Sequence, residues 1–138
     1  PTLREGDDSQ DKLVSVTDPR SLTTGYVYDG FGQLIQESSP DRGTMRYALD
    51  AAGKRVAERD GRNVLTTRTF DALDRVLTES FPDAPAENLT YSYDATGGGN
   101  RGVGRLTGFT DETGSTTLRY DERGNMVSTT RTIGGQAY

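Results

Sequence analysis

Acidic residues are the first candidates for chemistry in this chain, which contains 21 Asp and Glu but no His or Cys. The missing His and Cys exclude thiol nucleophiles, imidazole bases, disulfides and Cys/His zinc sites. Glu37, Glu58 and Glu79 recur every 21 residues, whereas a glycosidase needs two carboxylates in different environments. Because repeated positions share one environment, we interpret these glutamates as an outer ladder of cross-strand pairs with Arg46 and similar residues.

Two other patterns suggest ligand sites. Asp residues cluster at Asp7-Asp8 and recur at Asp41, Asp60, Asp83 and Asp111, but they lack the spacing of known calcium loops, so turn capping is the better interpretation. The segment 97–102 satisfies Gly-x-Gly-x-x-Gly, yet residues 105–111 after it are predicted to form a strand and not the helix that a dinucleotide site requires. We interpret 97–102 as a flexible hairpin insertion. We therefore expect no catalytic residues, metal or cofactor, and no enzyme.

Tyrosines offer a third possibility, because aromatic rings flanked by polar groups can stack on sugars. Tyr26, Tyr47 and Tyr91 are candidates for a glycan-binding face, or for the lining of a lumen. The 16 Lys and Arg are scattered and outnumbered by acidic residues, so we expect no nucleic-acid partner. No apolar run is long enough to span a bilayer, and no signal peptide is visible.

These residues belong to an internal repeat. An aromatic residue or Leu precedes Asp five times, with Asp-to-Asp steps of 21, 21, 23 and 27 residues. The five pairs are Tyr28-Asp29, Leu49-Asp50, Phe70-Asp71, Tyr93-Asp94 and Tyr120-Asp121. Three residues after the Asp stand Gly32, Gly53, Asp74 and Gly124. An Asp that accepts bonds from N–H groups two or three residues on, followed by a residue that tolerates positive φ, predicts a tight turn.

Strands are predicted on both sides of each turn. Residues before the Asp alternate, which places one pair per repeat on a single face. The pairs are Tyr26/Tyr28, Tyr47/Leu49, Arg68/Phe70, Tyr91/Tyr93 and Leu118/Tyr120. Leu, Ile, Val and Phe make up only about 18% of the residues. We therefore predict an all-β array of antiparallel hairpins of about 21 residues, forming one continuous, curved or spiralling sheet with a thin core.

The array is predicted over 12–138, after an irregular lead-in over 1–11. Residues 134–138 look like the approach to a sixth aromatic-Asp pair, so we expect the chain to be a piece of something longer. An isolated array of this kind has open edges and is expected to self-associate through them.

The repeated motif resembles the YD repeats of Rhs proteins. The resemblance covers roughly residues 12–138 and is carried by Tyr28-Asp29-Gly30-Phe31-Gly32-Gln33-Leu34, by its relatives at 70–77 and 120–127, and by the variant 93–111. It implies a spiralling sheet that closes into a cocoon-like shell. In bacterial members such a shell encloses a C-terminal toxin of a secreted or cell-surface effector. More distantly, it belongs to teneurin adhesion receptors.

The resemblance implies a non-enzymatic segment of such a shell, which encloses or scaffolds a C-terminal toxin in competition between bacteria. Its partners would be the rest of the parent shell and the toxin polypeptide. The alternative is a cell-surface module for carbohydrate binding or adhesion. The family's self-cleavage core has no counterpart, because Asp18-Pro19 lacks the following Gly.

Overall fold

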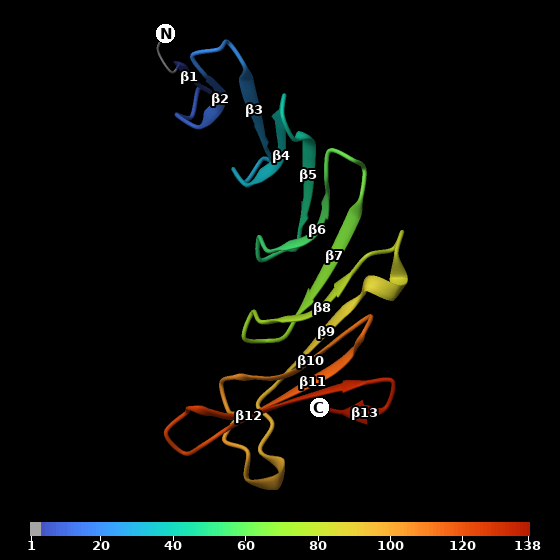
Figure 1. Ribbon diagram of the computed structural model, residues 1–138. Helices are drawn as coiled ribbons and strands as arrows, with labels where there is room; N and C mark the ends of the chain where they lie inside the picture. Colours follow the sequence, from blue (N-terminus) through green and yellow to red (C-terminus); the bar gives the residue numbers. More distant parts are fainter. Residues whose placement is uncertain (1–3) are drawn as a thin grey trace. The chain divides into compact units, whose positions relative to one another are not determined.

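The computed structural model describes residues 4–138 as thirteen β-strands and two short 3-10 turns (Figure 1). These residues contain no α-helix, and no helix among them is long and apolar enough to cross a membrane. The predicted all-β class is thus confirmed. The chain divides into two compact units, one ending at Thr66 and one beginning at Thr67, a division that the sequence did not reveal.

The first unit is a sheet whose strands are antiparallel neighbours in chain order. Its strands are β1 (Arg4–Asp7), β2 (Leu13–Thr17), β3 (Thr23–Tyr28), β4 (Leu34–Ser39), β5 (Gly43–Leu49) and β6 (Arg55–Arg59). The predicted irregular lead-in over 1–11 is wrong where it can be compared, because β1 pairs with β2. Residues 1–3 lie outside the described part of the chain.

The second unit continues the same pattern of hairpins, and the boundary between units falls within β7. Its elements are β7 (Leu65–Phe70), β8 (Val76–Ser80), η1 (Pro85–Glu87), β9 (Leu89–Tyr93), η2 (Gly97–Gly99), β10 (Leu106–Asp111), β11 (Gly114–Tyr120), β12 (Met126–Ile133) and β13 (Gln136–Ala137). Successive strands from β7 to β13 pair in antiparallel fashion. The predicted array of antiparallel hairpins is therefore confirmed.

Residues 134–138, which were predicted to approach a sixth aromatic-Asp pair, form a turn and the short strand β13. Gly134 and Gly135 form the turn between β12 and β13, with φ of 56° and 84°. Tyr138 comes directly after β13 and exchanges backbone hydrogen bonds with Arg131. It therefore lies near the glycine turn, whereas Tyr28 lies at the opposite, Asp-turn end of its strand.

The alternating strands give the sheet one better-covered face. In β5, Met45, Tyr47 and Leu49 are half-buried, while Arg46 and Ala48 between them are exposed. β9 alternates in the same way, with its tyrosines half-buried. No hydrophobic side chain is fully buried among the described residues. Each unit is therefore a single layer whose apolar face is only partly covered.

One turn geometry defines the hairpins, and Asp50 illustrates it. The Asp50 Oδ1 atom accepts hydrogen bonds from the N–H groups of Ala52 (2.8 Å) and Lys54 (2.9 Å). The Asp50 N–H donates to the Lys54 carbonyl, and the Gly53 N–H donates to the Asp50 carbonyl. The sequence predicted that the Asp carboxylate accepts hydrogen bonds from N–H groups two or three residues later. In the structure it accepts from those two and four residues later, because the N–H group three residues later donates to the Asp carbonyl.

Among residues 4–138 this turn is found seven times, the Asp50 turn included. Its capping residues are Asp8, Asp18, Asp29, Asp50, Asp60, Asp71 and Asp121. The residue three positions later always has positive φ: Asp11, Ser21, Gly32, Gly53, Asn63, Asp74 and Gly124. Only small or short polar residues occupy these positions, since they tolerate the left-handed region best.

The turns should make the fold sensitive to acid. Backbone N–H groups lower the pKa of Asp8, Asp18, Asp50, Asp60 and Asp71 below the usual range. A carboxyl with a lowered folded-state pKa stabilises the fold above its unfolded pKa, and this stabilisation is lost as pH falls through the folded pKa. We expect the melting temperature to be level above about pH 5 and to decrease below about pH 4.

Thermal unfolding followed by circular dichroism from pH 7 to pH 2.5 measures this effect. Asp50→Asn should lower the melting temperature at pH 7 by several degrees and should flatten part of the acid dependence. Asp41→Asn is the control, because Asp41 is exposed in a turn of another type. Equal acid profiles for both variants and the wild type would contradict the assignment.

Candidate functional site

The repeated junction between neighbouring hairpins is the main candidate site. Pairing between β2 and β3 begins beside the Asp18 turn and stops at Ser15 and Gly25, before it reaches the end of the strands where the Asp8 and Asp29 turns lie. The β8–β9 and β10–β11 pairs stop at equivalent places. Within a hairpin, by contrast, pairing continues through a β-bulge to Tyr28 and Leu34. Adjacent hairpins thus lack a backbone ladder at this end, and side chains make the connection.

The motif tyrosine makes the first of these connections. The hydroxyl of Tyr28 donates to the Leu13 carbonyl, which belongs to the preceding hairpin, at 2.8 Å. Tyr93 bonds in the same way to Val76, and Tyr120 to Leu106, each at 2.8 Å. In each case the acceptor is the first residue of the preceding return strand. The hydroxyl therefore satisfies a carbonyl that lies beyond the ladder between repeats.

A basic side chain from the preceding hairpin covers the same ring. Lys12 lies over Tyr28, with Nζ 5.7 Å from the ring centroid. The Arg75 guanidinium lies 4.3 Å above the Tyr93 ring, and Arg105 lies 5.6 Å above that of Tyr120. A cation in this position is attracted by the electron-rich ring face. Each of these tyrosines is thus tied to the preceding repeat at its hydroxyl and over its ring.

Arg75 also connects two motif aspartates. Its Nε atom donates to Asp71 at 2.7 Å, while its two terminal nitrogens donate to Asp94 at 3.1 and 2.6 Å. Hydrogen bonding to Asp94 and then to Asp71 raises the pKa of Arg75. The bond from Arg75 and a further bond from the Gly104 N–H lower the pKa of Asp94. Arg75 therefore links the turn at Asp71 to the end of β9 at Asp94.

The turn glycines leave room for these side chains. A Cβ atom on Gly32 would collide with the Lys12 ammonium group, and one on Gly124 would collide with the Arg105 guanidinium. A Cβ atom on Gly53 would similarly meet the Gln33 side chain. At these positions Gly serves two purposes, since it adopts positive φ and admits a side chain from the preceding repeat.

The sequence signal missed two parts of the repeat. Asp8 caps a turn 21 residues before Asp29 and therefore belongs to the same series as the five aromatic-Asp or Leu-Asp pairs. No aromatic residue precedes Asp8, so the motif did not indicate it. The residue that bulges out of each return strand was also missed. It stands six positions after the capping Asp and is aliphatic in five return strands, at Val14, Ile35, Val56, Leu77 and Val127, whereas β10, which follows the insertion after Asp94, has Thr107 at its bulge. Two adjacent aliphatic or long residues recur after these five turns, and this recurrence would have indicated the bulge.

The remaining motif residues vary the junction. Leu49 and Phe70 are half-buried at the ends of β5 and β7, next to their Asp turns. Neither has a hydroxyl group to donate. Asp74 adopts the positive φ (63°) that glycine adopts elsewhere. The bond to a neighbouring carbonyl is therefore a feature of the tyrosine repeats alone.

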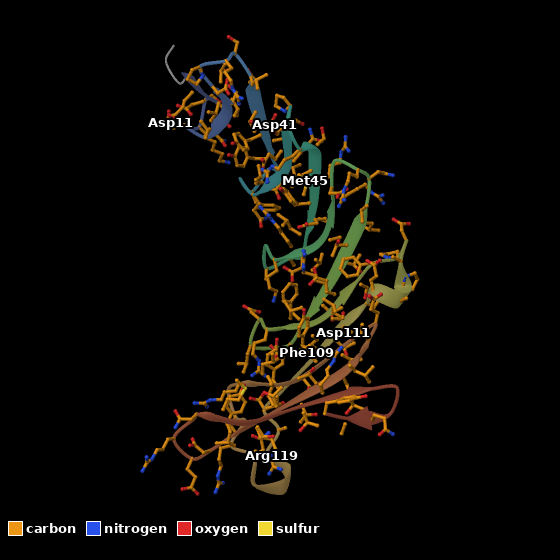
Figure 2. All side chains as sticks on the ribbon, in the orientation of Figure 1. Asp11, Asp41, Met45, Phe109, Asp111 and Arg119 are labelled. Carbon is orange, nitrogen blue, oxygen red and sulfur yellow. The ribbon has the colours of Figure 1, made fainter. Side chains whose placement is uncertain are left out.

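The insertion after Asp94 closes a junction in a different way. Asn100 is 4% exposed, and its side-chain amide donates to the Leu118 carbonyl and accepts from the Tyr120 N–H, both at 2.9 Å. Asn100 thus imitates a strand residue along β11. Arg119 donates to the Gly98 carbonyl on the same loop (Figure 2). The prediction of a flexible insertion is corrected, because the loop is anchored by these bonds, and β10 follows it as expected.

The predicted outer ladder of glutamates is wrong. Glu37, Glu58 and Glu79 lie directly opposite Tyr26, Tyr47 and Arg68 on paired strands. Directly opposed residues share a face, so these glutamates lie on the tyrosine face, whereas Arg46 lies on the other. The reason is that the bulge shifts the register of each return strand by one residue.

Two of these glutamates, Glu79 and Glu37, are paired with cations. Glu79 accepts a hydrogen bond from Arg68 at 2.8 Å, and Arg42 donates to Glu37. Burial, and then the charge of Glu79, raises the pKa of the Tyr91 hydroxyl. Among residues 4–138, no cluster of acidic side chains has an arrangement that would hold a metal ion.

The candidate lumen or glycan residues Tyr26, Tyr47 and Tyr91 are half-buried on this face. The Arg55 guanidinium lies 3.8 Å above the Tyr47 ring. A sugar stacking on that side of the ring would have to displace Arg55. Tyr91 lines an open depression over β9, β10 and β11 together with Phe109, which Figure 2 labels.

Removing one tyrosine hydroxyl should weaken a junction. We expect Tyr93→Phe to reduce the free energy of unfolding by about 1 kcal/mol, because the Val76 carbonyl loses its donor. Urea denaturation followed by circular dichroism measures this change. Tyr138→Phe is the control, since Tyr138 is 76% exposed. A Tyr93 variant as stable as the control would exclude the proposed role of the hydroxyl.

Loss of the Asn100 side chain should cost more. We expect Asn100→Ala to destabilise the protein by about 2 kcal/mol, because the Leu118 carbonyl and the Tyr120 N–H lose their partner in a buried place. The same denaturation experiment applies, with Thr96→Ala in the exposed part of the loop as control. Equal stability of the two variants would show that the loop does not close the junction.

Comparison with solved structures identifies the fold. The chain superposes on the crystal structure of TcdB2-TccC3-Cdc42 with a TM-score of 0.73, and on the Photorhabdus luminescens Tc holotoxin pore with a TM-score of 0.72. Identity is 19% in both cases, and the match covers 94% of this chain. The chain spans only 7% of the length of those chains. No curated protein sequence matches the chain.

A family model gives the sequence relationship. The model described as RHS Repeat matches residues 8–44 and 102–136, which together are just over half of the chain. Both segments contain a capped Asp turn and a motif tyrosine, around Asp29 and Asp121. The predicted resemblance is confirmed, and this chain belongs to the Rhs repeat family.

Proposed function

We propose that this chain is a non-enzymatic wall segment of a larger Rhs-type shell, and that the shell encloses a C-terminal toxin polypeptide. The partners would be the other repeats of the shell and the enclosed polypeptide. The parent protein would act outside the producing cell, as a secreted or cell-surface effector. This role concerns containment and requires no catalytic group from the segment itself.

The junction carries this proposal. Each tyrosine repeat is bonded to the preceding hairpin through the same hydroxyl and the same ring contact. Such contacts extend a sheet in one direction and do not fold it around a core of its own. The lack of fully buried hydrophobic side chains among the described residues agrees with a wall, whose apolar face needs another partner.

The charged groups also favour a structural role. The motif aspartates bond to backbone N–H groups or to Arg75, and glutamates on the tyrosine face pair with arginines. A general acid or base needs a pKa near the working pH, whereas the pKa values of Asp50 and Asp71 are lowered by hydrogen bonds from backbone N–H groups. The likeness to chains of Tc toxin assemblies supports the shell fold.

Protease protection in the full-length parent protein tests the proposal. We expect a C-terminal polypeptide to resist trypsin when it is joined to the intact array, and to be digested rapidly when it is produced alone. A variant carrying Tyr28→Phe, Tyr93→Phe and Tyr120→Phe should shorten the protection, because three junctions are weakened; Tyr138→Phe is the matched control. Equal digestion rates with and without the array would overturn the proposal.

A further inference from the structure

An open depression lies between the Asp29 and Asp50 turns, within the first unit and far from both ends of the sequence. Its volume is about 510 Å³. The lining includes two carboxylates, an amide and apolar side chains, from Asp29, Phe31, Gln33, Leu49, Asp50 and Ala52. Among the described residues, none that lines the depression is basic. The depression therefore combines negative charge with an apolar wall.

At three other junctions a basic side chain reaches from one Asp turn to the next hairpin. It comes from the residue whose carbonyl accepts the N–H group of the Asp that begins the turn. For the described turns at this end of the hairpins, these residues are Lys12, Gln33, Lys54, Arg75, Arg105 and Asn125. Lys12, Arg75 and Arg105 each lie over the tyrosine of the following hairpin. Asn125 belongs to the last of these turns, so Gln33 is the one neutral residue of the series that stands between two of them.

Gln33 makes only part of the contact that Arg75 makes. The Arg75 guanidinium bonds to Asp71 of its own turn and to Asp94 on the next hairpin. The Gln33 amide likewise donates to Asp29 of its own turn, at 3.3 Å. It is neutral and has a shorter side chain than arginine. The contact within the turn is thus present here, whereas the charged contact to the next turn is not.

The Asp50 carboxylate borders the depression on the other side. The Gln33 side chain lies beside Gly53 of this turn, but within residues 4–138 it makes no hydrogen bond to Asp50. The ammonium group of Lys54 is 3.8 Å from the Asp50 Oδ2 atom, which is a long separation for an ion pair. A carboxylate has about four acceptor sites. Asp50 therefore retains acceptor capacity toward the depression.

Phe31 adds an aromatic surface that the turn itself does not require. It stands two residues after Asp29, and it is 90% exposed. The equivalent residues of other turns at this end are Gln10, Ala52, Leu73 and Arg123. A guanidinium group pairs with carboxylates through several donors and also stacks on aromatic faces. The groups around the depression thus suit this cation better than an ammonium group or a neutral group.

We propose that this depression binds an arginine side chain of a polypeptide, with the guanidinium group against the Phe31 ring and between the Asp29 and Asp50 carboxylates. The bound guanidinium makes there the link between turns that Arg75 makes within its own chain. The proposal goes beyond the wall function, because it assigns a particular ligand group to one place on the wall.

Nuclear magnetic resonance titration of the isotope-labelled chain tests the proposal. The probe is N-acetylarginine N-methylamide, and the citrulline compound is the matched control, because it has nearly the same shape and no charge. The lysine compound tests whether charge alone is sufficient. We expect the arginine compound to cause saturable shifts of the Phe31, Ala52 and Gly53 N–H signals, with half-saturation in the millimolar range. The citrulline and lysine compounds should bind at least about fivefold more weakly.

Two substitutions with matched controls locate the site. Gln33→Arg should abolish binding, because the new side chain can link the two turns itself, whereas Asn125→Arg adds the same charge in another turn and should leave binding unchanged. Phe31→Ala should weaken binding about threefold through loss of the ring contact. Leu73→Ala removes an exposed side chain at the equivalent position and should have no effect. Circular dichroism and thermal unfolding establish that the four variants are folded.

Several results would overturn the proposal. They are absence of saturable shifts, shifts confined to residues outside 29–53, equal binding of the citrulline or lysine compound, and unchanged binding by Gln33→Arg or Phe31→Ala. Equal weakening by Gln33→Arg and Asn125→Arg would also overturn it, because it would indicate only a long-range effect of charge. Protease protection of a C-terminal polypeptide is measured independently, so failure here is distinguishable from failure of the wall function.

Discussion

The structure depends on one constraint, namely that neighbouring hairpins share a backbone ladder at one end and not at the other. The bulge in each return strand carries the strand on to its Asp turn within the hairpin, while pairing to the next hairpin stops earlier. The carbonyl of the first residue in the return strand therefore lies beyond the backbone pairing with the next hairpin. The motif tyrosine donates its hydroxyl to this carbonyl, which explains why Tyr precedes the Asp in three of the repeats.

The Asn100 loop provides hydrogen-bond partners for backbone groups that lie beyond the pairing of β10 with β11. Its side-chain amide has a donor and an acceptor in one plane, as a peptide group does, and therefore fits the backbone groups of Leu118 and Tyr120. A carboxamide in a loop and a phenol on a strand are thus two solutions to one geometric problem. The second unit contains both, side by side around β11.

Much of the hairpin array could be predicted from the sequence, because alternation and Asp-x-x-Gly turns are local signals. Asp60 was interpreted as a turn-capping residue, but the identity of the Asp18 and Asp60 turns with the Asp29 turn was hidden by Ser21 and Asn63 at the positive-φ position. The face of Glu37, Glu58 and Glu79 was predicted wrongly, since the bulge reverses the alternation. The tyrosine acceptors lie 14 to 17 residues away in the chain and depend on pairing that no local pattern indicates.

The direction of the contacts has a consequence for evolution. Each motif tyrosine places its hydroxyl and its ring against the hairpin before it, and that hairpin supplies the carbonyl and the cation. The unit that contains Tyr93, Arg105 and Leu106 therefore has the donor on one side and the acceptor and cation on the other. Gene duplication of this unit would preserve the contacts at both of its boundaries, so the number of such units can change without any compensating substitution.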